Sequence, residues 1–351
     1  MELKLVYSDV FLKHEPWYHH PENPLRLKIL FKGLEKYGLN EYYEIIEPEP
    51  SDWTPIYKVH AEGYVDYVRR LAEHAPTEID PDTYVSKGTL DAVLNSIGGL
   101  IKAYKMYREG RGNKFFVLTR PPGHHAGRAG KAMGAPTQGF CIFNNIAILA
   151  SYLLSEGYER IAIIDFDVHH GNGTQEIFYR NPRVLHIDFH QDPRTLYPGT
   201  GFPEDLGSGK ALGTKVNLIF PRHGGDDLYR DFLEIALTIL KQFNPQVILY
   251  SAGFDAYYMD GLADMKASSH TFHAMAREVI EELKPKLIIA SLEGGYSIGL
   301  EKGAPAFIAG LIGLEDPVNE FYRSSIRVRD YFEKKIYYPT RRLLNEYWDI
   351  Y

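Results

Sequence analysis

The chain of 351 residues contains a single cysteine, Cys141, and only three tryptophans. One cysteine excludes an intrachain disulfide and suits a reducing compartment. No apolar run approaches the roughly 20 residues that span a membrane, and residues 1–8 lack the long apolar core of a secretory signal. No long basic run occurs, and 46 acidic residues outnumber 39 basic ones, for a net charge of −7. We therefore expect a cytoplasmic protein that binds neither membranes nor nucleic acid directly.

Apolar runs typical of strands alternate along the chain with segments of helical spacing. The expected strands are residues 3–7, 114–120, 161–167, 184–189, 215–220, 246–252 and 286–292. Apolar residues recur at helical spacing within residues 90–104, 146–154, 228–239 and 272–280. This alternation predicts an α/β fold in which helices cover both faces of a parallel sheet. Since no repeat or linker interrupts it, we expect one domain over residues 1–315, with a helical extension at 316–351 packed on it.

Four of these apolar runs lead into glycines and reactive polar residues. Those residues are His124 and His125; Asp165, Asp167 and His169; Asp255; and Tyr296. Side chains two apart in a strand share a face, so Asp165, Asp167 and His169 point the same way if the extended geometry persists. A carboxylate and an imidazole at that spacing reach one cation. Because ligand clefts lie at the carboxyl ends of parallel strands, the four runs together predict a metal site with proton-handling groups.

The order and spacing of the motifs resemble those of the histone deacetylase superfamily, which includes acetylpolyamine amidohydrolases and prokaryotic relatives. The matching segments are residues 20–26, 59–64, 80–86, 120–125, 139–141, 165–172, 197–201, 252–255 and 293–296. The resemblance implies an arginase-like three-layer αβα fold with a central, mostly parallel sheet of eight strands. It also implies a zinc-dependent amidohydrolase that removes an acetyl or other acyl group from an acetyl-lysine side chain or a similar slim aliphatic N-acetylated amine.

By this resemblance, Asp167, His169 and Asp255 are the metal ligands. Three protein ligands with one open position are the arrangement of a catalytic zinc site. Zinc is the family expectation, and iron(II) or cobalt(II) suits the same oxygen and nitrogen donors. The alternative for Asp167 and Asp255 is that each caps the helix that follows its strand.

The resemblance also assigns the proton-handling groups. His125 matches the general base, and His124 matches the histidine that orients the water. The family pattern pairs His124 with Asp165 and His125 with Asn172. Many relatives carry aspartate at the position of Asn172, and the neutral amide should stabilise an imidazolium less. Tyr296 matches a hydroxyl donor to the oxygen that becomes negative as the amide carbon turns tetrahedral.

Further positions match a substrate channel. Phe140 and Tyr197 match two aromatic walls that grip a slim apolar chain. Gly139 is expected to offer its carbonyl to the incoming amide. Asp82 matches a position at the channel rim, and Arg26 matches an arginine that lines an inner channel. A salt bridge in a structural loop is the alternative for Arg26.

Two departures from the family pattern concern selectivity and a second ion. Polyamine-preferring relatives can carry an acidic residue seven positions after the last metal ligand, where this chain has Leu262. The neutral side chain favours an acyl-lysine or another slim amide. The alternative is that Asp260, two residues away, supplies the carboxylate instead. A site for K⁺ or Na⁺ is implied at Asp165, Asp167, His169, Asp188 and Phe189. Asp188 stands where serine is frequent, so its carboxylate either strengthens cation binding or pairs with a nearby base.

Two other functions compete with the deacetylase interpretation. A binuclear manganese ureohydrolase has the same fold, but it needs a second aspartate-rich ligand cluster that the motifs around His124, His125 and Asp255 do not supply. A catalytically inactive reader of acyl-lysine is opposed by the presence of every expected catalytic group. Cys141 is interpreted as a core residue and His170 as a structural histidine off the ligand face. Whether the acetylated substrate is a protein or a small molecule stays open.

Overall fold

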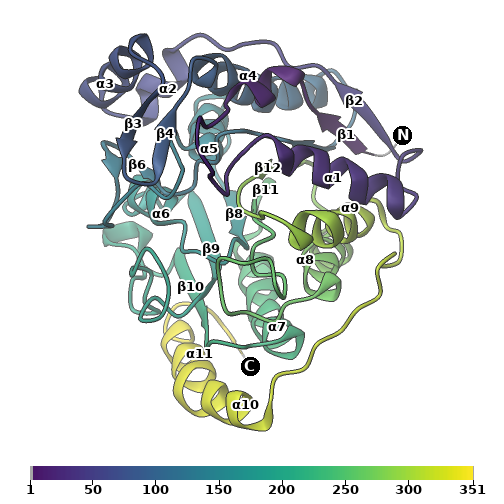
Figure 1. Cartoon of the computed structure of the whole chain (residues 1–351). Helices are drawn as coiled ribbons and strands as arrows, with labels where there is room; N and C mark the ends of the chain where they lie inside the picture. The colour runs from purple at the N-terminus through teal and green to yellow at the C-terminus, as the bar shows by residue number, and fades with distance from the viewer. Residues whose placement is uncertain (1–2, 351) are drawn as a thin grey trace.

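The computed structural model describes residues 3–350 and is built around one sheet of eight strands (Figure 1). The strands lie in the order β10-β9-β8-β11-β12-β5-β1-β2, and every neighbouring pair is parallel. Their bounds are β1 Leu3–Val6, β2 Tyr43–Ile46, β5 Lys114–Val117, β8 Ile161–Asp165, β9 Val184–Gln191, β10 Lys215–Phe220, β11 Val247–Ala252 and β12 Ile288–Leu292. Two short antiparallel hairpins stand apart from it, β3 Thr77–Asp80 with β4 Thr83–Val85 and β6 Ala126–Gly127 with β7 Gly130–Lys131.

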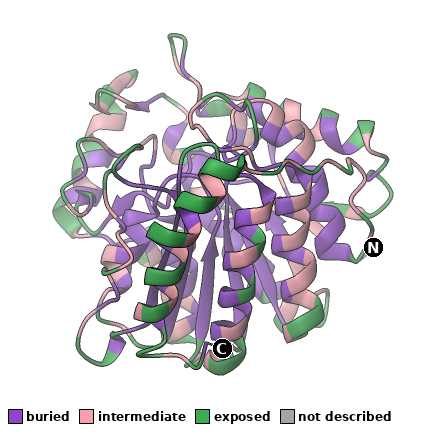
Figure 2. Ribbon diagram, turned by 90° about the horizontal axis from the view of Figure 1, so that it is seen from below, coloured by how far each residue is buried: buried purple, intermediate pink, exposed green. Residues whose placement is uncertain are grey.

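Helices cover both faces of the sheet, as Figure 2 shows by the buried strands between them. They are α1 Leu25–Lys36, α2 Thr54–Val59, α3 Glu62–Glu73, α4 Thr89–Arg108, α5 Asn145–Ser155, α6 Asn172–Phe178, α7 Asp226–Phe243, α8 Ser269–Leu283, α9 Ala304–Ile312, α10 Ile326–Phe332 and α11 Tyr338–Leu344. The period of two along each strand divides the core. In β8, Ala162 and Ile164 belong to the cluster that α7, α8 and α9 cover, whereas Ile161 and Ile163 face the cluster under α4 and α5. The predicted three-layer arrangement is confirmed.

The seven predicted strands and four predicted helices all occur, with ends shifted by a few residues. The eighth strand, β2, was not predicted from the apolar pattern. It pairs with β1 at the edge of the sheet, and Ile46 is its only buried residue. An edge strand that buries one side chain carries little of the apolar signal on which the prediction depends.

The segment after residue 315 contains α10 and α11, joined by a π-helical turn, Glu333–Tyr337. In Figure 1 these yellow helices lie beside the edge strand β10. Phe332 is fully buried, and its ring lies 5.0 Å from that of Phe232 and 6.2 Å from that of Phe220. The boundary at residue 315 stays a prediction. Within residues 3–350 no helix combines the length and apolarity that crossing a bilayer requires.

The order in which strands are added to the sheet changes side at β8. After β8 it continues to β9 and β10 on one side, whereas β11 and β12 lie on the other side of β8. A crevice at the carboxyl ends of such strands is the usual ligand site of an open α/β sheet. The four runs with polar ends, β8, β11, β12 and β5, are consecutive in the sheet. Their carboxyl ends therefore place the polar residues side by side.

Candidate active site

Asp167, His169 and Asp255 converge beyond the ends of β8 and β11. One potential ligand atom from each lies within 4.8 Å of the other two. His169 Nδ1 is 3.0 Å from Asp167 Oδ1 and 3.1 Å from Asp255 Oδ2. Asp255 Oδ2 is buried and accepts no hydrogen bond in the described chain despite that short distance. An unpaired buried carboxylate oxygen is costly, and contact with a cation removes that cost.

The remaining atoms of these carboxylates are held by backbone amides. Asp255 Oδ1 accepts from Val168 N at 2.9 Å, and Asp167 Oδ2 accepts from Gly294 N at 2.8 Å. A Cβ on Gly294 would lie 2.3 Å from Asp255 Oδ2, so only glycine lets this amide come so close. These bonds hold the carboxylates in place, as outer-shell groups do around metal ligands.

The electrostatics of the three residues reflect two carboxylates brought together away from water. Burial and the charge of Asp167 raise the pKa of Asp255 to about 6. Burial alone would lower the pKa of His169, but the hydrogen bond to Asp167 and the nearby charges of Asp255 and Asp167 raise it to about 9. The concentration of negative charge attracts a proton to His169, and it equally attracts a metal cation.

His124 is buried between two acidic side chains. Its Nδ1 lies 3.0 Å from Asp165 Oδ2, as the family pattern predicts, and its Nε2 lies 3.7 Å from Asp167 Oδ1. Burial lowers the pKa of His124, but the charges of Asp165 and Asp167 outweigh it and raise that pKa well above the ordinary value. The two neighbouring carboxylates therefore favour the cationic form of His124.

His125 is held in the opposite protonation state. Its Nδ1 lies 2.8 Å from Asn172 Oδ1. The orientation of that amide is settled by Asn172 Nδ2, which donates to Ala132 O at 2.9 Å. Nδ1 of His125 therefore carries the proton, and Nε2 keeps a free lone pair. Burial, together with the charges of His124 and His169, lowers the pKa of His125 well below its ordinary value.

The two adjacent histidines have complementary protonation preferences. Their ring centroids are 4.0 Å apart, and the ring of His125 lies 5.9 Å from that of His169. A neutral imidazole is ready to accept a proton, and a cationic one stabilises negative charge. Placed beside a candidate metal site, this pair can serve water-dependent cleavage of a polar bond.

Tyr296 follows β12 and faces the same region. Its ring meets Phe140 edge-on, with centroids 5.8 Å apart, and the Arg26 guanidinium lies 4.9 Å from its ring centroid. Burial raises the pKa of Tyr296 well above 10. The hydroxyl therefore keeps its proton and can act as a hydrogen-bond donor.

Two of the predicted channel residues, Tyr197 and Gly139, lie against His125. Tyr197 packs edge-on against His125 with centroids 5.0 Å apart, and its hydroxyl donates to Thr137 O at 2.9 Å. Gly139 has φ = 54°, and a Cβ there would lie 2.5 Å from His125 Cδ2 and 2.8 Å from Tyr197 Cε1. Phe140 also has a positive φ, 69°, and is half-buried. The site thus has no room for a side chain at Gly139 beside the candidate base.

Arg26, Asp82 and Leu262 occupy different settings. Arg26 is buried; Nε donates to Gly295 O at 2.7 Å, and the other nitrogens reach Glu22 Oε1 and Glu293 O. It therefore supports the loop that carries Tyr296. Asp82 is half-buried between β3 and β4 and accepts from the Thr137 hydroxyl. Leu262 is half-buried in the loop after β11.

Asp260 does not offer a carboxylate at the rim in place of Leu262. It is 5% exposed, and its oxygens accept from the backbone amides of residues 296, 297 and 299. The idea that it substitutes for an acidic rim residue is wrong, because its oxygens are committed to these amides. No apolar pattern in the sequence indicated this role.

Among the residues expected around a monovalent cation, Asp188 pairs with bases. Its Oδ1 lies 2.6 Å from His190 Nδ1, and its Oδ2 accepts from Gly171 N at 2.8 Å. His186 Nε2 is 3.5 Å from Asp188 Oδ2 and 4.0 Å from Asp165 Oδ2. Phe189 is fully buried. The predicted pairing of Asp188 with a nearby base is thus present, and the cation site itself stays a prediction.

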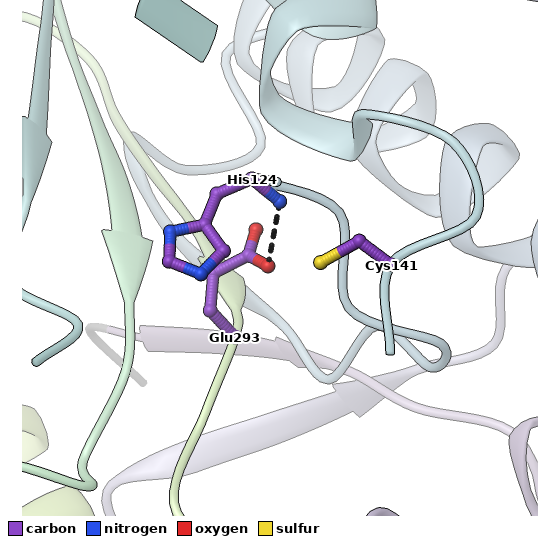
Figure 3. Close-up of side chains that lie close together, drawn as sticks. All are labelled: His124, Cys141 and Glu293. Atoms are coloured by element: carbon purple, nitrogen blue, oxygen red, sulfur yellow. Dashed lines mark hydrogen bonds between the residues drawn. The ribbon is translucent and has the colours of Figure 1, made fainter. Parts of the chain in front are cut away.

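Glu293 is a buried neighbour of the site that the sequence did not single out. Its Oε2 accepts from Gly123 N at 2.7 Å and His124 N at 3.2 Å, which holds the turn that carries both histidines (Figure 3). Burial raises the pKa of Glu293 to about 7. Figure 3 also shows Cys141 next to this pair. Burial raises the pKa of the Cys141 thiol well above its ordinary value, which suits the predicted core role.

His170 points away from the ligand group. Its Nδ1 lies 2.9 Å from Thr200 Oγ1, and its Nε2 lies 3.2 Å from Gln175 Oε1. Burial lowers the pKa of His170 to about 3. A neutral histidine with both nitrogens occupied has the structural role that the sequence predicted.

Comparisons with known proteins agree with this geometry. The family model described as the histone deacetylase domain matches residues 20–311. A probable deacetylase of Archaeoglobus fulgidus is 36% identical, with 98% of both chains covered. A histone deacetylase-like amidohydrolase of Pseudomonas aeruginosa is 33% identical and covers 89% of this chain and 80% of its own length. The crystal structure of the HDA15 HD domain superposes with a TM-score of 0.86 at 29% identity, covering 99% of this chain and 95% of that one.

The fold, the order of the motifs and these relatives agree over almost the whole chain. The family match extends from the segment before α1 to the end of α9. The architecture is accordingly the arginase/deacetylase-like αβα fold. This chain belongs to the histone deacetylase family.

Proposed function

We propose that this protein is a zinc-dependent deacetylase that hydrolyses the amide of acetyl-lysine or of another slim aliphatic N-acetylated amine. The observation that carries the proposal is that a buried group of candidate ligands lies beside a histidine whose Nε2 is unprotonated. The ligands are Asp167, His169 and Asp255, and the histidine is His125. Ligands without a base suit a structural ion, and a base without ligands suits other chemistry. Together they suit metal-assisted hydrolysis.

The donor set fits a catalytic zinc ion. Two carboxylates and one imidazole are ligands that zinc accepts, and three protein ligands leave a position open for substrate or water. The unpaired Asp255 Oδ2 supports a cation at this point. Iron(II) or cobalt(II) fits the same donors. When bound there, zinc supplies a Lewis acid that polarises the amide carbonyl and lowers the pKa of water to about 7.

The residues around this position have distinct tasks. His125 takes the proton of the attacking water at Nε2, because Nδ1 is committed to Asn172. It later gives the proton to the leaving amine. His124 stabilises the developing negative charge as a cation, with Asp165 as its partner. Tyr296 donates its hydroxyl to the carbonyl oxygen as the carbon becomes tetrahedral.

The proposed substrate channel suits a narrow aliphatic amine. We assign Phe140 and Tyr197 as its aromatic walls and the Gly139 carbonyl as the acceptor of the substrate N–H. Asp82 stands at the rim, and Leu262 provides a neutral surface that favours acetyl-lysine over a polyamine. The source of the amine, a protein or a small molecule, is decided by a panel of acetyl-lysine peptides against acetylated putrescine and spermidine.

The direct test is amine release from a fluorogenic acetyl-lysine peptide, with and without a chelator. We expect turnover that the chelator abolishes and added zinc restores. His125→Ala should keep the metal and lose turnover. Absence of chelator-sensitive release at any metal loading, on peptides and polyamines alike, would refute the proposal.

Metal content separates the deacetylase from a binuclear manganese ureohydrolase. Asp165, His186 and Asp188 form another group of ligand-type atoms within 4.8 Å of one another. Two-metal sites hold their ions about 3.5–4 Å apart, and no carboxylate belongs both to this group and to Asp167, His169 and Asp255 to bridge such a pair. We expect about one zinc per chain, and two manganese ions with urea release would favour the alternative. An inactive reader would bind acetyl-lysine peptides without turning them over.

A further inference from the structure

Asp260 is turned inward between two exposed residues of the loop after β11. Met259 before it is 72% exposed and Gly261 after it is exposed, yet Asp260 is 5% exposed. The backbone is left-handed on both sides, with φ = 67° at Met259 and 116° at Gly261. A non-glycine residue rarely adopts a positive φ, so this conformation points to a constraint on the residue that it carries inward.

The carboxylate of Asp260 accepts hydrogen bonds from backbone amides at the end of the Glu293-Gly-Gly-Tyr296 motif and just after it. Its Oδ2 accepts from Tyr296 N at 2.7 Å, and its Oδ1 accepts from Ser297 N at 2.9 Å and Gly299 N at 2.8 Å. The Ser297 hydroxyl lies 2.9 Å from Asp260 O and 3.1 Å from its Oδ1. Hydrogen bonds to an ionised acceptor are among the strongest that a protein makes.

These bonds restrict the backbone around Tyr296, which its neighbouring glycines would otherwise let adopt several conformations. Gly294 and Gly295 precede Tyr296, and Gly295 has φ = 105°, so the chain can pivot on that side. On the other side Gly299 packs so tightly on Phe254 that a Cβ would lie 1.9 Å from Phe254 O. Asp260 is thus the side chain that fixes the amide of Tyr296 itself.

Asp260 also joins Tyr296 to the metal-ligand loop. It lies five residues after Asp255, and the same loop is tied to the motif through Phe254 N, which donates to Gly294 O at 3.1 Å. The two loops are thus tied at two points, and the bond between Phe254 and Gly294 remains when the Asp260 carboxylate is replaced. The hydroxyl donor and the ligand carboxylate are held as one unit, although they come from different strands.

We propose that Asp260 is a positioning residue that sets Tyr296 for the reaction. The proposal rests on the proposed function, in which Tyr296 donates to the carbonyl oxygen. A misplacement of about 1 Å at a reacting group can cost about 100-fold in rate. Asp260 acts on the transition state through Tyr296, and not on substrate binding or metal content.

The variant Asp260→Asn tests this, because it keeps the volume but turns an NH₂ toward amides that also donate. We expect kcat to fall about 10- to 100-fold with KM nearly unchanged and zinc content equal to that of the wild type. Tyr296→Phe should cost about 100- to 1,000-fold. The double variant should be no slower than Tyr296→Phe alone, because Asp260 acts through that hydroxyl. Multiplied losses in the double variant would overturn the proposal.

Asp226→Asn is the matched control. Asp226 is 1% exposed and accepts from Ser268 N at 2.8 Å and Tyr322 N at 2.6 Å, and none of its hydrogen-bond partners is a candidate ligand residue. It should reproduce any loss of thermal stability without the loss of kcat. A kcat in Asp226→Asn as low as in Asp260→Asn would reduce Asp260 to a general structural role and overturn the proposal.

Amide hydrogen exchange provides a readout that does not depend on turnover. In Asp260→Asn the amides of residues 296, 297 and 299 should exchange faster, while those of β12 stay protected. If the wild type has no deacetylase activity, the proposed function fails, but unchanged exchange in this segment would refute the positioning role by itself. If Asp260→Asn does not fold, Asp260→Ala replaces it, with the same expected exchange and kinetics.

Discussion

Replacement of Asn172 by aspartate tests most directly whether Asn172 controls the protonation of His125. Asn172 Oδ1 lies 2.8 Å from His125 Nδ1, so the variant puts a carboxylate where a neutral amide now accepts. With about 4 Å between the charge centres and an effective dielectric constant of about 20, the attraction to an imidazolium is about 4 kcal/mol. That energy sets an upper bound of about three units on the rise in the pKa of His125.

The amide already accepts a hydrogen bond from His125, and burial of the new carboxylate reduces the gain, so we expect the pKa of His125 to rise by about one to three units. The wild-type pKa is held well below 6.5 by burial and by His124 and His169. A higher pKa keeps His125 protonated, and so unable to act as a base, up to a higher pH. The acidic limb of the kcat/KM profile should therefore move upward, while activity at alkaline pH is retained.

The assay is kcat/KM for a fluorogenic acetyl-lysine peptide from about pH 5 to pH 9, read as the pKa values of the free enzyme. Loss of the bond from Asn172 Nδ2 to Ala132 O should also cost about 1–3 kcal/mol of stability. Asn217→Asp is the matched control, since Asn217 is buried and donates to the carbonyls of Phe202 and Asp205 in another part of the chain. If the acidic limb of the kcat/KM profile stays in place, or moves equally in the control, Asn172 does not control the protonation of His125.

Three further predictions concern the ligands, the channel and the C-terminal helices. Asp255→Ala should weaken zinc binding by more than the about 10- to 100-fold that loss of an outer-shell partner costs, and a full equivalent of zinc by elemental analysis would contradict the ligand assignment. Gly139→Ala should abolish turnover but spare zinc content, because the added Cβ would lie 2.5 Å from His125 Cδ2; a kcat near that of the wild type would disprove this contact. Phe332→Ala should cost about 3–5 kcal/mol in denaturant unfolding, because the ring is fully buried against Phe232, and a loss below about 1 kcal/mol would show that α10 is not part of the core.

The candidate metal site could be located because its motifs lie directly after strong apolar runs, whereas the ligand set and the two histidine pairings came from the resemblance to the deacetylase family. Asp167, His169 and Asp255 meet at adjacent strands, and the pairings of His124 and His125 with Asp165 and Asn172 are present. Glu293 and Asp260 could not be assigned in the same way. Their roles consist of hydrogen bonds to amides distant in sequence, and no local pattern encodes such bonds.

What the order of residues determined by itself is the alternation of apolar runs and helical segments, and hence a parallel sheet with polar groups at one edge. Strand and helix periodicity are local properties, so they can be read without the fold. Only the tertiary structure decided that β8, β11, β12 and β5 are consecutive, that Arg26 supports the Tyr296 segment, and that Asp260 points inward. Those outcomes depend on packing between distant segments, which orients side chains toward partners that their own neighbours in sequence do not specify.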